Sequence, residues 1–86
     1  MRALRLSLSP AKELRVDREP VTSTSVCSVG YDAESQILEV EFVGGAVYQY
    51  FGVTEAHYRG LMTAASKGKY LDRHIESGGF RYSQIR

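Results

Sequence analysis

Two consecutive segments joined by a pair of glycines constrain the fold more than any other feature of this chain. Over residues 37–43, apolar side chains alternate with Glu39 and Glu41, which is typical of a strand that buries one face. Gly44-Gly45 follows at once, and glycine adopts the positive φ angles of a tight turn at no steric cost. The next residues are again rich in aromatic and β-branched side chains. The sequence therefore predicts a β-hairpin.

The length of the loop decides which side chains share a face of this hairpin. A two-residue loop places Val43 opposite Ala46, and all other pairs follow from that one. The side chains then expected to face the core are Leu38, Val40, Phe42, Val47 and Phe51. Tyr48 and Tyr50 are expected on the other face, among the glutamates. This assignment depends on the loop, because a slip of one residue exchanges the two faces.

The other patterns predict an α+β fold. Residues 25–31 indicate a strand before the hairpin, and residues 80–85 indicate a last strand that closes the sheet. Thr54 is a suitable N-cap for a helix that ends near Ala65, and a second, short helix is expected over residues 69–76. Strands grouped together and helices grouped together favour a small antiparallel meander packed by two helices.

The N-terminus has a different character from the rest of the chain. Residues 21–86 form the predicted domain, and residues 1–20 form an extension ahead of it. Leucines alternate with polar residues over residues 4–8, which indicates an edge strand, whereas residues 11–20 indicate a linker or a short frayed helix. Two alternatives stay open for the extension: an edge strand, or an arm that orders on a partner.

Composition argues for a binding protein without cofactors. The 86 residues suffice for one domain, and the single cysteine, Cys27, cannot form an internal disulfide. His57, His74 and Asp72 do not show the spacing of a metal site, and no nucleophile elbow is present. A membrane span needs about 18 consecutive apolar residues, and the chain has no such run. We therefore expect a cytoplasmic protein with no catalytic residues, no metal, no cofactor and no membrane contact.

Charge is distributed unevenly along the chain. Residues 1–20 carry five basic and three acidic groups (net +2), residues 21–56 carry five acidic groups and no basic one (net −5), and residues 57–86 carry six basic and two acidic groups (net +4). A basic face of this kind suits a polyanion. The alternative is that the basic ends attract the acidic centre across the fold.

The basic tail contains the strongest candidate site. In Ser66-Lys67-Gly68-Lys69-Tyr70, two lysines flank a glycine that lets an anion approach closely, which suits a phosphate group. The other interpretation is an ordinary turn with solvated lysines. Aromatic side chains on a sheet can stack on bases, although tyrosine is also a common structural residue in strands. The predicted nucleic-acid-binding residues are Lys67, Lys69, Tyr70, Arg73, Arg81, Tyr48 and Tyr50.

An ordered set of short motifs resembles the KTSC domain family. The resemblance covers about residues 22–85 and rests on Ser28-Val29-Gly30-Tyr31-Asp32, Leu38-Glu39-Val40-Glu41-Phe42, Gly45, Val47-Tyr48-Gln49-Tyr50, Gly52-Val53, Tyr58, Leu61, Ala65-Ser66-Lys67-Gly68-Lys69-Tyr70 and Ile75. The chain departs from the family pattern at Thr54, where proline is usual, and at Asp72, where asparagine is common. The family takes its name from an association with the C-terminus of lysyl-tRNA synthetases. The resemblance therefore implies nucleic-acid binding, and it implies no enzymatic activity.

Two functions follow as predictions. The first is a non-enzymatic domain that binds RNA or another single-stranded nucleic acid through the basic C-terminal patch. The second is a protein-interaction or homodimerisation module, which uses the acidic, tyrosine-bearing face of the hairpin together with the N-terminal strand.

Overall fold

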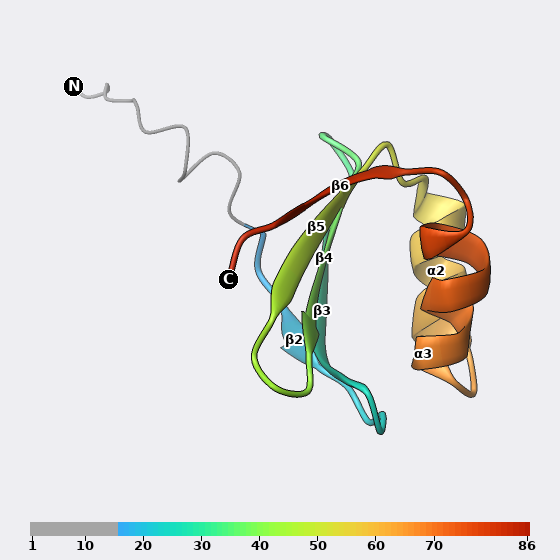
Figure 1. The fold of residues 1–86 in the computed structure, drawn as a ribbon. Helices are drawn as coiled ribbons and strands as arrows, with labels where there is room; N and C mark the ends of the chain where they lie inside the picture. The colour runs from blue at the N-terminus through green and yellow to red at the C-terminus, as the bar shows by residue number, and fades with distance from the viewer. Residues whose placement is uncertain (1–15) are drawn as a thin grey trace.

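The fold is one antiparallel sheet with helices on a single face (Figure 1). The computed structural model describes residues 16–86, so the strand expected over residues 4–8 lies outside the described part of the chain. Neighbouring strands in the sheet are also consecutive in the sequence, in the order β2-β3-β4-β5-β6, and every pair is antiparallel. This meander confirms the predicted α+β class. The elements are β2 (Glu19–Pro20), β3 (Val26–Asp32), β4 (Ile37–Phe42), β5 (Val47–Phe51), α2 (Glu55–Thr63), α3 (Lys67–Tyr70), the π-helical segment η1 (Leu71–Glu76) and β6 (Arg81–Gln84).

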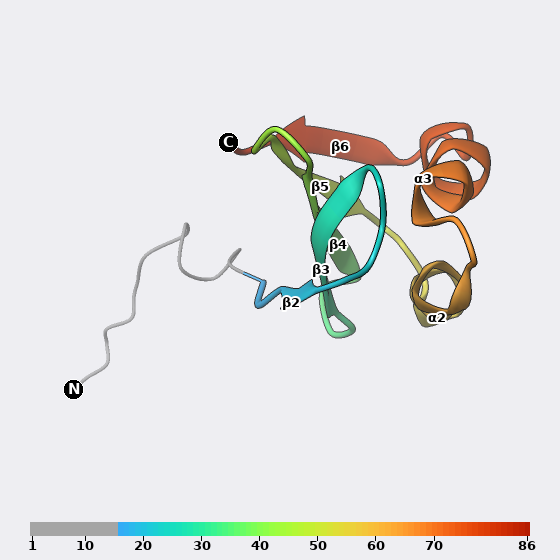
Figure 2. The ribbon, with the colours of Figure 1, turned by 90° about the horizontal axis from the view of Figure 1, so that it is seen from below.

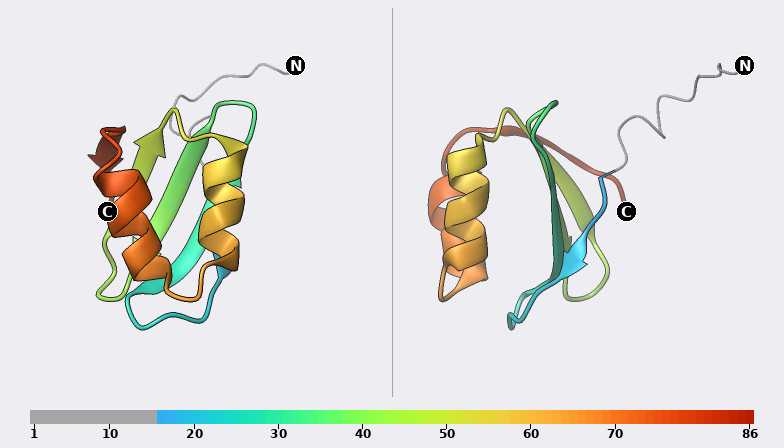
Figure 3. Two further views of the ribbon diagram at one scale, coloured as in Figure 1. Left: turned by 90° about the vertical axis from the view of Figure 1, so that its right-hand side faces the viewer. Right: turned by 180° about the vertical axis from the view of Figure 1, so that it is seen from behind.

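The helices lie side by side on the same face of the sheet (Figure 2; Figure 3, left). Helix α2 begins where the sequence predicts, because the Thr54 side chain accepts a hydrogen bond from the backbone N–H of His57. The second helix begins two residues earlier than predicted, at Lys67 instead of Lys69. Ser66 caps it by accepting from the backbone N–H of Lys69.

The sequence Ser66-Lys67-Gly68 suggests a turn with Gly68 as a left-handed C-cap of the first helix, but Gly68 instead lies inside α3. Its backbone has no positive φ angle. A Cβ at position 68 would meet the Ser25 hydroxyl in its present rotamer, so glycine gives α3 room beside the start of β3.

The hairpin has a three-residue loop, 43–45, and this overturns the predicted register. The backbone N–H of Phe42 donates to the carbonyl of Ala46 (2.8 Å), and the N–H of Gly45 donates to the carbonyl of Phe42 (2.9 Å). Both glycines adopt positive φ angles, as predicted, at 106° and 103°. However, the extra loop residue shifts the pairing by one position.

The shift moves every side chain of β5 to the face opposite the predicted one. Val40 pairs with Tyr48 and Leu38 pairs with Tyr50, so both tyrosines lie on the helix-covered face. The core assignments of Val47 and Phe51 were wrong, since these residues share the opposite face with the glutamates of β4. That opposite face is called the outer face below.

The core lies between the helix-covered face and the helices. Tyr31 from β3 stacks on Tyr58 from α2 with ring centroids 4.8 Å apart, and its hydroxyl donates to the carbonyl of Val53 (2.6 Å). Because of burial and the nearby acidic groups Glu55 and Asp32, the pKa of Tyr31 is raised above its usual value of 10.0. The buried apolar residues of this core are Val26, Val29, Leu38, Val40, Tyr50, Val53, Leu61, Leu71 and Ile75.

Residues 16–20 pack against the sheet, although the sequence indicates a linker or a frayed helix there. Glu19–Pro20 forms β2 at the edge beside β3, and Val16 is buried. The backbone of Asp17 crosses so close to Gly30 that any side chain at position 30 would collide with the Asp17 carbonyl. The missing side chain of Gly30 thus provides the room for this segment.

Candidate functional site

The outer face of the sheet carries a connected set of charged side chains. Arg18 forms an ion pair with Glu39, whose side chain is almost fully buried, and Gln49 donates to the other carboxylate oxygen of Glu39 (2.8 Å). Arg86 pairs with Glu41 at 2.9 Å. One arginine from each basic end of the described chain thus meets a glutamate of the acidic centre. This supports attraction across the fold, and it reduces the basic charge available to a ligand.

Glu41 is held in its charged form by its neighbours. The hydroxyl of Ser28 donates to one carboxylate oxygen (2.8 Å), and Arg86 donates to the other. Chiefly because of the Ser28 hydrogen bond, and also because of the positive charges of Arg86 and Arg18, the pKa of Glu41 lies below its usual value of 4.5.

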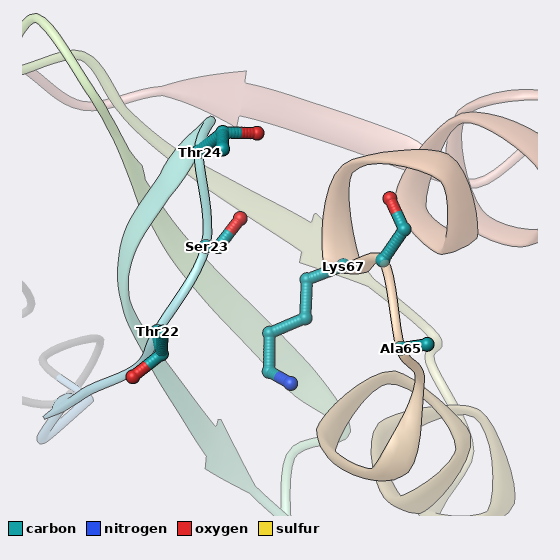
Figure 4. A pocket seen from close by; sticks show the side chains of 6 residues that line it. Thr22, Ser23, Thr24, Ala65 and Lys67 are labelled. Carbon is teal, nitrogen blue, oxygen red and sulfur yellow. The ribbon is translucent and has the colours of Figure 1, made fainter.

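A polar pocket lies between the segment that leads into β3 and the connection from α2 to α3. It has a volume of about 460 Å³ and is lined by Thr22, Ser23, Thr24, Ala65, Ser66 and Lys67. Figure 4 shows the Lys67 side chain extending across the space between the Thr22–Thr24 segment and helix α2. The hydroxyl groups of serine and threonine and the ammonium group of lysine commonly contact phosphate oxygens. We call this pocket the hydroxyl pocket.

Lys67 has a structural role in addition to lining the hydroxyl pocket. Its ammonium nitrogen lies 3.3 Å from the carbonyl oxygens of Met62 and Ala64, at the C-terminal end of α2. A cation at this end of a helix is favourable, because the last carbonyls lack partners and carry partial negative charge. The ammonium group has three protons, so one remains for a ligand in the pocket.

Lys69 and Arg73 are exposed basic residues in the helical segment that follows Lys67. They lie one helical turn apart across the junction of α3 and η1, and both are exposed. Within residues 16–86 neither forms an ion pair. Tyr70 does not extend this basic surface as predicted for stacking, because its hydroxyl end packs against Gly60 of α2 and its ring contacts His74.

Arg81 is not brought to the predicted basic patch. It pairs with Phe51 at the end of the sheet opposite Ser25, and its guanidinium lies 5.8 Å from the centre of the Phe51 ring. Phe51 belongs to the outer face, whereas Lys67 and Lys69 lie on the helix side. The sequence could not exclude Arg81, because its place depends on the turn between η1 and β6.

Tyr48 and Tyr50 are also separated from the lysines. Together with Tyr82 and Glu76, they line a second pocket of about 410 Å³ that shares no residue with the hydroxyl pocket. Sequence reasoning missed Thr22, Ser23 and Thr24 of the hydroxyl pocket, as well as Glu76 and Tyr82 of the second pocket. The run of hydroxyl residues over 22–25 was a visible signal, but nothing local indicated that it meets Lys67.

Two further observations bear on the class of protein. In residues 16–86, no three His, Cys, Asp or Glu side chains gather closely enough to hold a metal ion. Of the helices in that range, none is long and apolar enough to cross a bilayer.

The protein is a small α+β domain in which one antiparallel meander carries helical segments on a single face. The family follows from comparison with known proteins. The chain matches the KTSC domain over residues 22–80, and it belongs to the KTSC domain family. The KTSC domain is a domain of unknown function that is associated with homologues of lysyl-tRNA ligases.

Relatives of known sequence and structure agree with this assignment. A crystal structure of a KTSC domain protein from Yersinia pestis superposes with a TM-score of 0.76 at 38% identity, over 84% of this chain and 100% of that chain. An uncharacterised protein of Stutzerimonas stutzeri is 40% identical over 79% of this chain and 96% of its own length. A lysine–tRNA ligase of Trichormus variabilis is 40% identical over 64% of this chain, which is 10% of the ligase.

Proposed function

We propose that this protein is a non-enzymatic binding domain for the backbone of RNA or single-stranded nucleic acid. The binding surface comprises the hydroxyl pocket and the exposed side chains of Lys69 and Arg73. The observation that carries the proposal is the convergence of four hydroxyl residues and the Lys67 side chain on one pocket. Serine, threonine and lysine contacts of this kind bind phosphates without reading sequence. A cytoplasmic location is part of the same proposal.

The similarity to lysine–tRNA ligases supports a nucleic acid as the ligand. Segments of three such ligases, among them those of Trichormus variabilis and Nostoc punctiforme, are 36–40% identical to this chain over 55 residues. The name of those proteins includes a tRNA. A small domain beside such an enzyme can add non-specific affinity for RNA, because phosphate contacts supply most of the sequence-independent binding energy.

The second candidate function, a protein interface on the acidic face of the hairpin, has less support because that face carries no tyrosines. The tyrosines that would have enriched the acidic face lie on the helix-covered face instead. On the outer face, Glu39 and Glu41 are already paired with Arg18 and Arg86. Dimerisation through residues 1–15 falls outside the described part of the chain.

The proposal is tested by fluorescence anisotropy with labelled single-stranded RNA, tRNA and duplex DNA at two salt concentrations. Lys69→Gln combined with Arg73→Gln is the variant of choice, because Lys67 also stabilises the end of α2 and its loss would mix folding with binding. We expect weaker RNA binding and a salt slope that falls by about 0.7 for each lost phosphate contact.

Each of the two substitutions is also made singly, and Arg81→Gln is the matched control for each single variant. It removes the same charge at the far end of the sheet, so RNA affinity should stay close to that of the wild type. If the double variant binds RNA as tightly as the wild type does, or if Arg81→Gln weakens binding equally, the proposed surface is wrong.

A further inference from the structure

Three tyrosine rings and one carboxylate meet at the edge of the sheet formed by β5 and β6. The ring centroids are separated by 6.2 Å for Tyr48 and Tyr50, 5.9 Å for Tyr48 and Tyr82, and 6.0 Å for Tyr50 and Tyr82. With Glu76 they line a pocket of about 410 Å³. We call this pocket the tyrosine pocket.

The register of the sheet and the end of η1 create the tyrosine pocket. Tyr48 and Tyr50 are two residues apart in β5 and so point to the same face, and Tyr82 lies directly opposite Tyr50 in β6. Glu76 is the last residue of η1. The hydroxyl of Tyr50 donates to a Glu76 carboxylate oxygen at 3.2 Å, which fixes the carboxylate beside the rings.

The charge of this pocket lacks a counterion within the described part of the chain. Among residues 16–86, no lysine, arginine or histidine lies within ion-pair distance of Glu76. Tyr82 is 64% exposed, so its ring can be reached from solvent. A carboxylate without a cation within residues 16–86 thus lies next to the exposed ring of Tyr82, the partly buried ring of Tyr48 and the buried ring of Tyr50.

These groups share one electrostatic preference. The faces of aromatic rings carry negative potential and attract organic cations, and a carboxylate adds a full negative charge. Burial, and after it the negative charge of Glu76, raise the pKa of Tyr50, so its hydroxyl stays protonated near neutral pH. The Tyr50 hydroxyl therefore adds no negative charge of its own to the pocket.

We propose that the tyrosine pocket binds an organic cation: an ammonium or guanidinium group on an aliphatic stem, such as a lysine or arginine side chain. The stem contacts the rings, and the charged group lies near the Glu76 carboxylate. A nucleotide is disfavoured here, because Glu76 would repel its phosphate group. This site is distinct from the hydroxyl pocket, which has the opposite charge preference.

The first experiment is an NMR titration of the protein with tetramethylammonium and with n-butylammonium, compared with uncharged tert-butanol. Tetramethylammonium and tert-butanol are of similar size and differ in charge, so the pair isolates the electrostatic contribution. We expect saturable shifts of the Tyr48, Tyr50 and Tyr82 ring signals with both cations and none with tert-butanol. Equal shifts with tert-butanol would reduce the site to a hydrophobic patch and overturn the proposal.

Two substitutions test the pocket itself. Glu76→Gln keeps an acceptor for the Tyr50 hydroxyl and removes the charge, and cation binding should weaken about fivefold. Tyr82→Leu keeps apolar bulk and removes the ring face, and binding should weaken about threefold. Both side chains are exposed, so the fold should survive. Glu34→Gln, in the exposed turn before β4, is the control with the same change of charge and should leave binding unchanged.

The source of the cation is distinguished by a further comparison. Tighter binding of an end-blocked tripeptide with a central lysine than of n-butylammonium would support a protein side chain, whereas equal binding would support a small amine. Single-stranded RNA provides the opposing test. If Glu76→Gln strengthens RNA binding and Tyr82→Leu weakens it, the rings stack on bases and the proposal is wrong.

Discussion

The two faces of the sheet are buried to nearly the same extent by different means. In β4, Leu38 is 0% exposed on the helix-covered face and Glu39 is 3% exposed on the outer face. Leu38 belongs to the apolar core, whereas Glu39 is paired with the Arg18 guanidinium and accepts a hydrogen bond from Gln49. Adjacent residues of one strand therefore depend on apolar packing and on ion pairing, respectively.

Because of this difference, the two faces of the sheet should respond differently to amino-acid substitution. Apolar burial is non-directional, so its cost on substitution follows the volume removed. A buried ion pair contributes little net stability, but removal of one partner leaves a charge that is expensive to keep out of water. The helix-covered face should therefore respond to size and the outer face to charge.

Leu38→Ala should have the largest effect, because it leaves a cavity in the middle of the core. We expect a loss of about 3 kcal/mol in the free energy of unfolding, measured by urea denaturation. Leu38→Met, which nearly conserves volume, is the control and should cost less than about 1.5 kcal/mol. A similar cost for both variants would contradict the view that this face responds to size.

Arg18→Met should cost about 2 kcal/mol, because it leaves Glu39 without its cationic partner. Replacing both partners, Arg18→Met with Glu39→Leu, should restore most of that loss. Arg59→Met removes an exposed ion pair with Glu55 and should change stability by less than about 0.5 kcal/mol in the same urea assay. If the double variant were no more stable than Arg18→Met alone, charge burial would not govern this face.

Gly30→Ala should cost about 1–2 kcal/mol, because the added methyl group meets the backbone carbonyl of Asp17. The loss should be local. Hydrogen exchange should accelerate at the backbone N–H of Val21, which bonds to the carbonyl of Cys27, but not at Leu61 in α2. Cys27→Ala, at an exposed irregular position of the same strand, is the control and should leave both amides unchanged.

Acid should weaken the outer face through Glu41, and this is the smallest expected effect. The pKa of Glu41 is lowered in the folded state, so its contribution to stability is present above about 4.5 and is lost as the pH falls through the lower, folded value. We expect the difference in urea midpoint between pH 7 and pH 3 to shrink in Glu41→Gln. Ser28→Ala should also shrink it, because the Ser28 hydrogen bond is the main cause of the lowered pKa. If the difference in urea midpoint between pH 7 and pH 3 stayed the same in both variants, Glu41 would not be the group through which acid weakens the outer face.

Local sequence signals predicted the candidate site only where a single segment contains it. The motif from Ser66 to Tyr70 did mark the lining of the hydroxyl pocket, since Lys67 and Ser66 are part of it. The partner residues Thr22, Ser23 and Thr24 could not be assigned, because they are more than 40 positions away and carry no pattern beyond polarity. Arg81 was grouped with the lysines by charge alone, and the direction of β6 separates them.

The sequence by itself determined the class of fold, the strands of the hairpin, the start of α2 at Thr54 and the family. These features depend on alternation, capping and glycine φ angles, all of which act within a few residues. The tertiary structure alone decided which faces the tyrosines occupy and which charges meet. A single extra residue in the loop 43–45 moved Tyr48 and Tyr50 to the helix-covered face, because side chains in a strand alternate with a period of two.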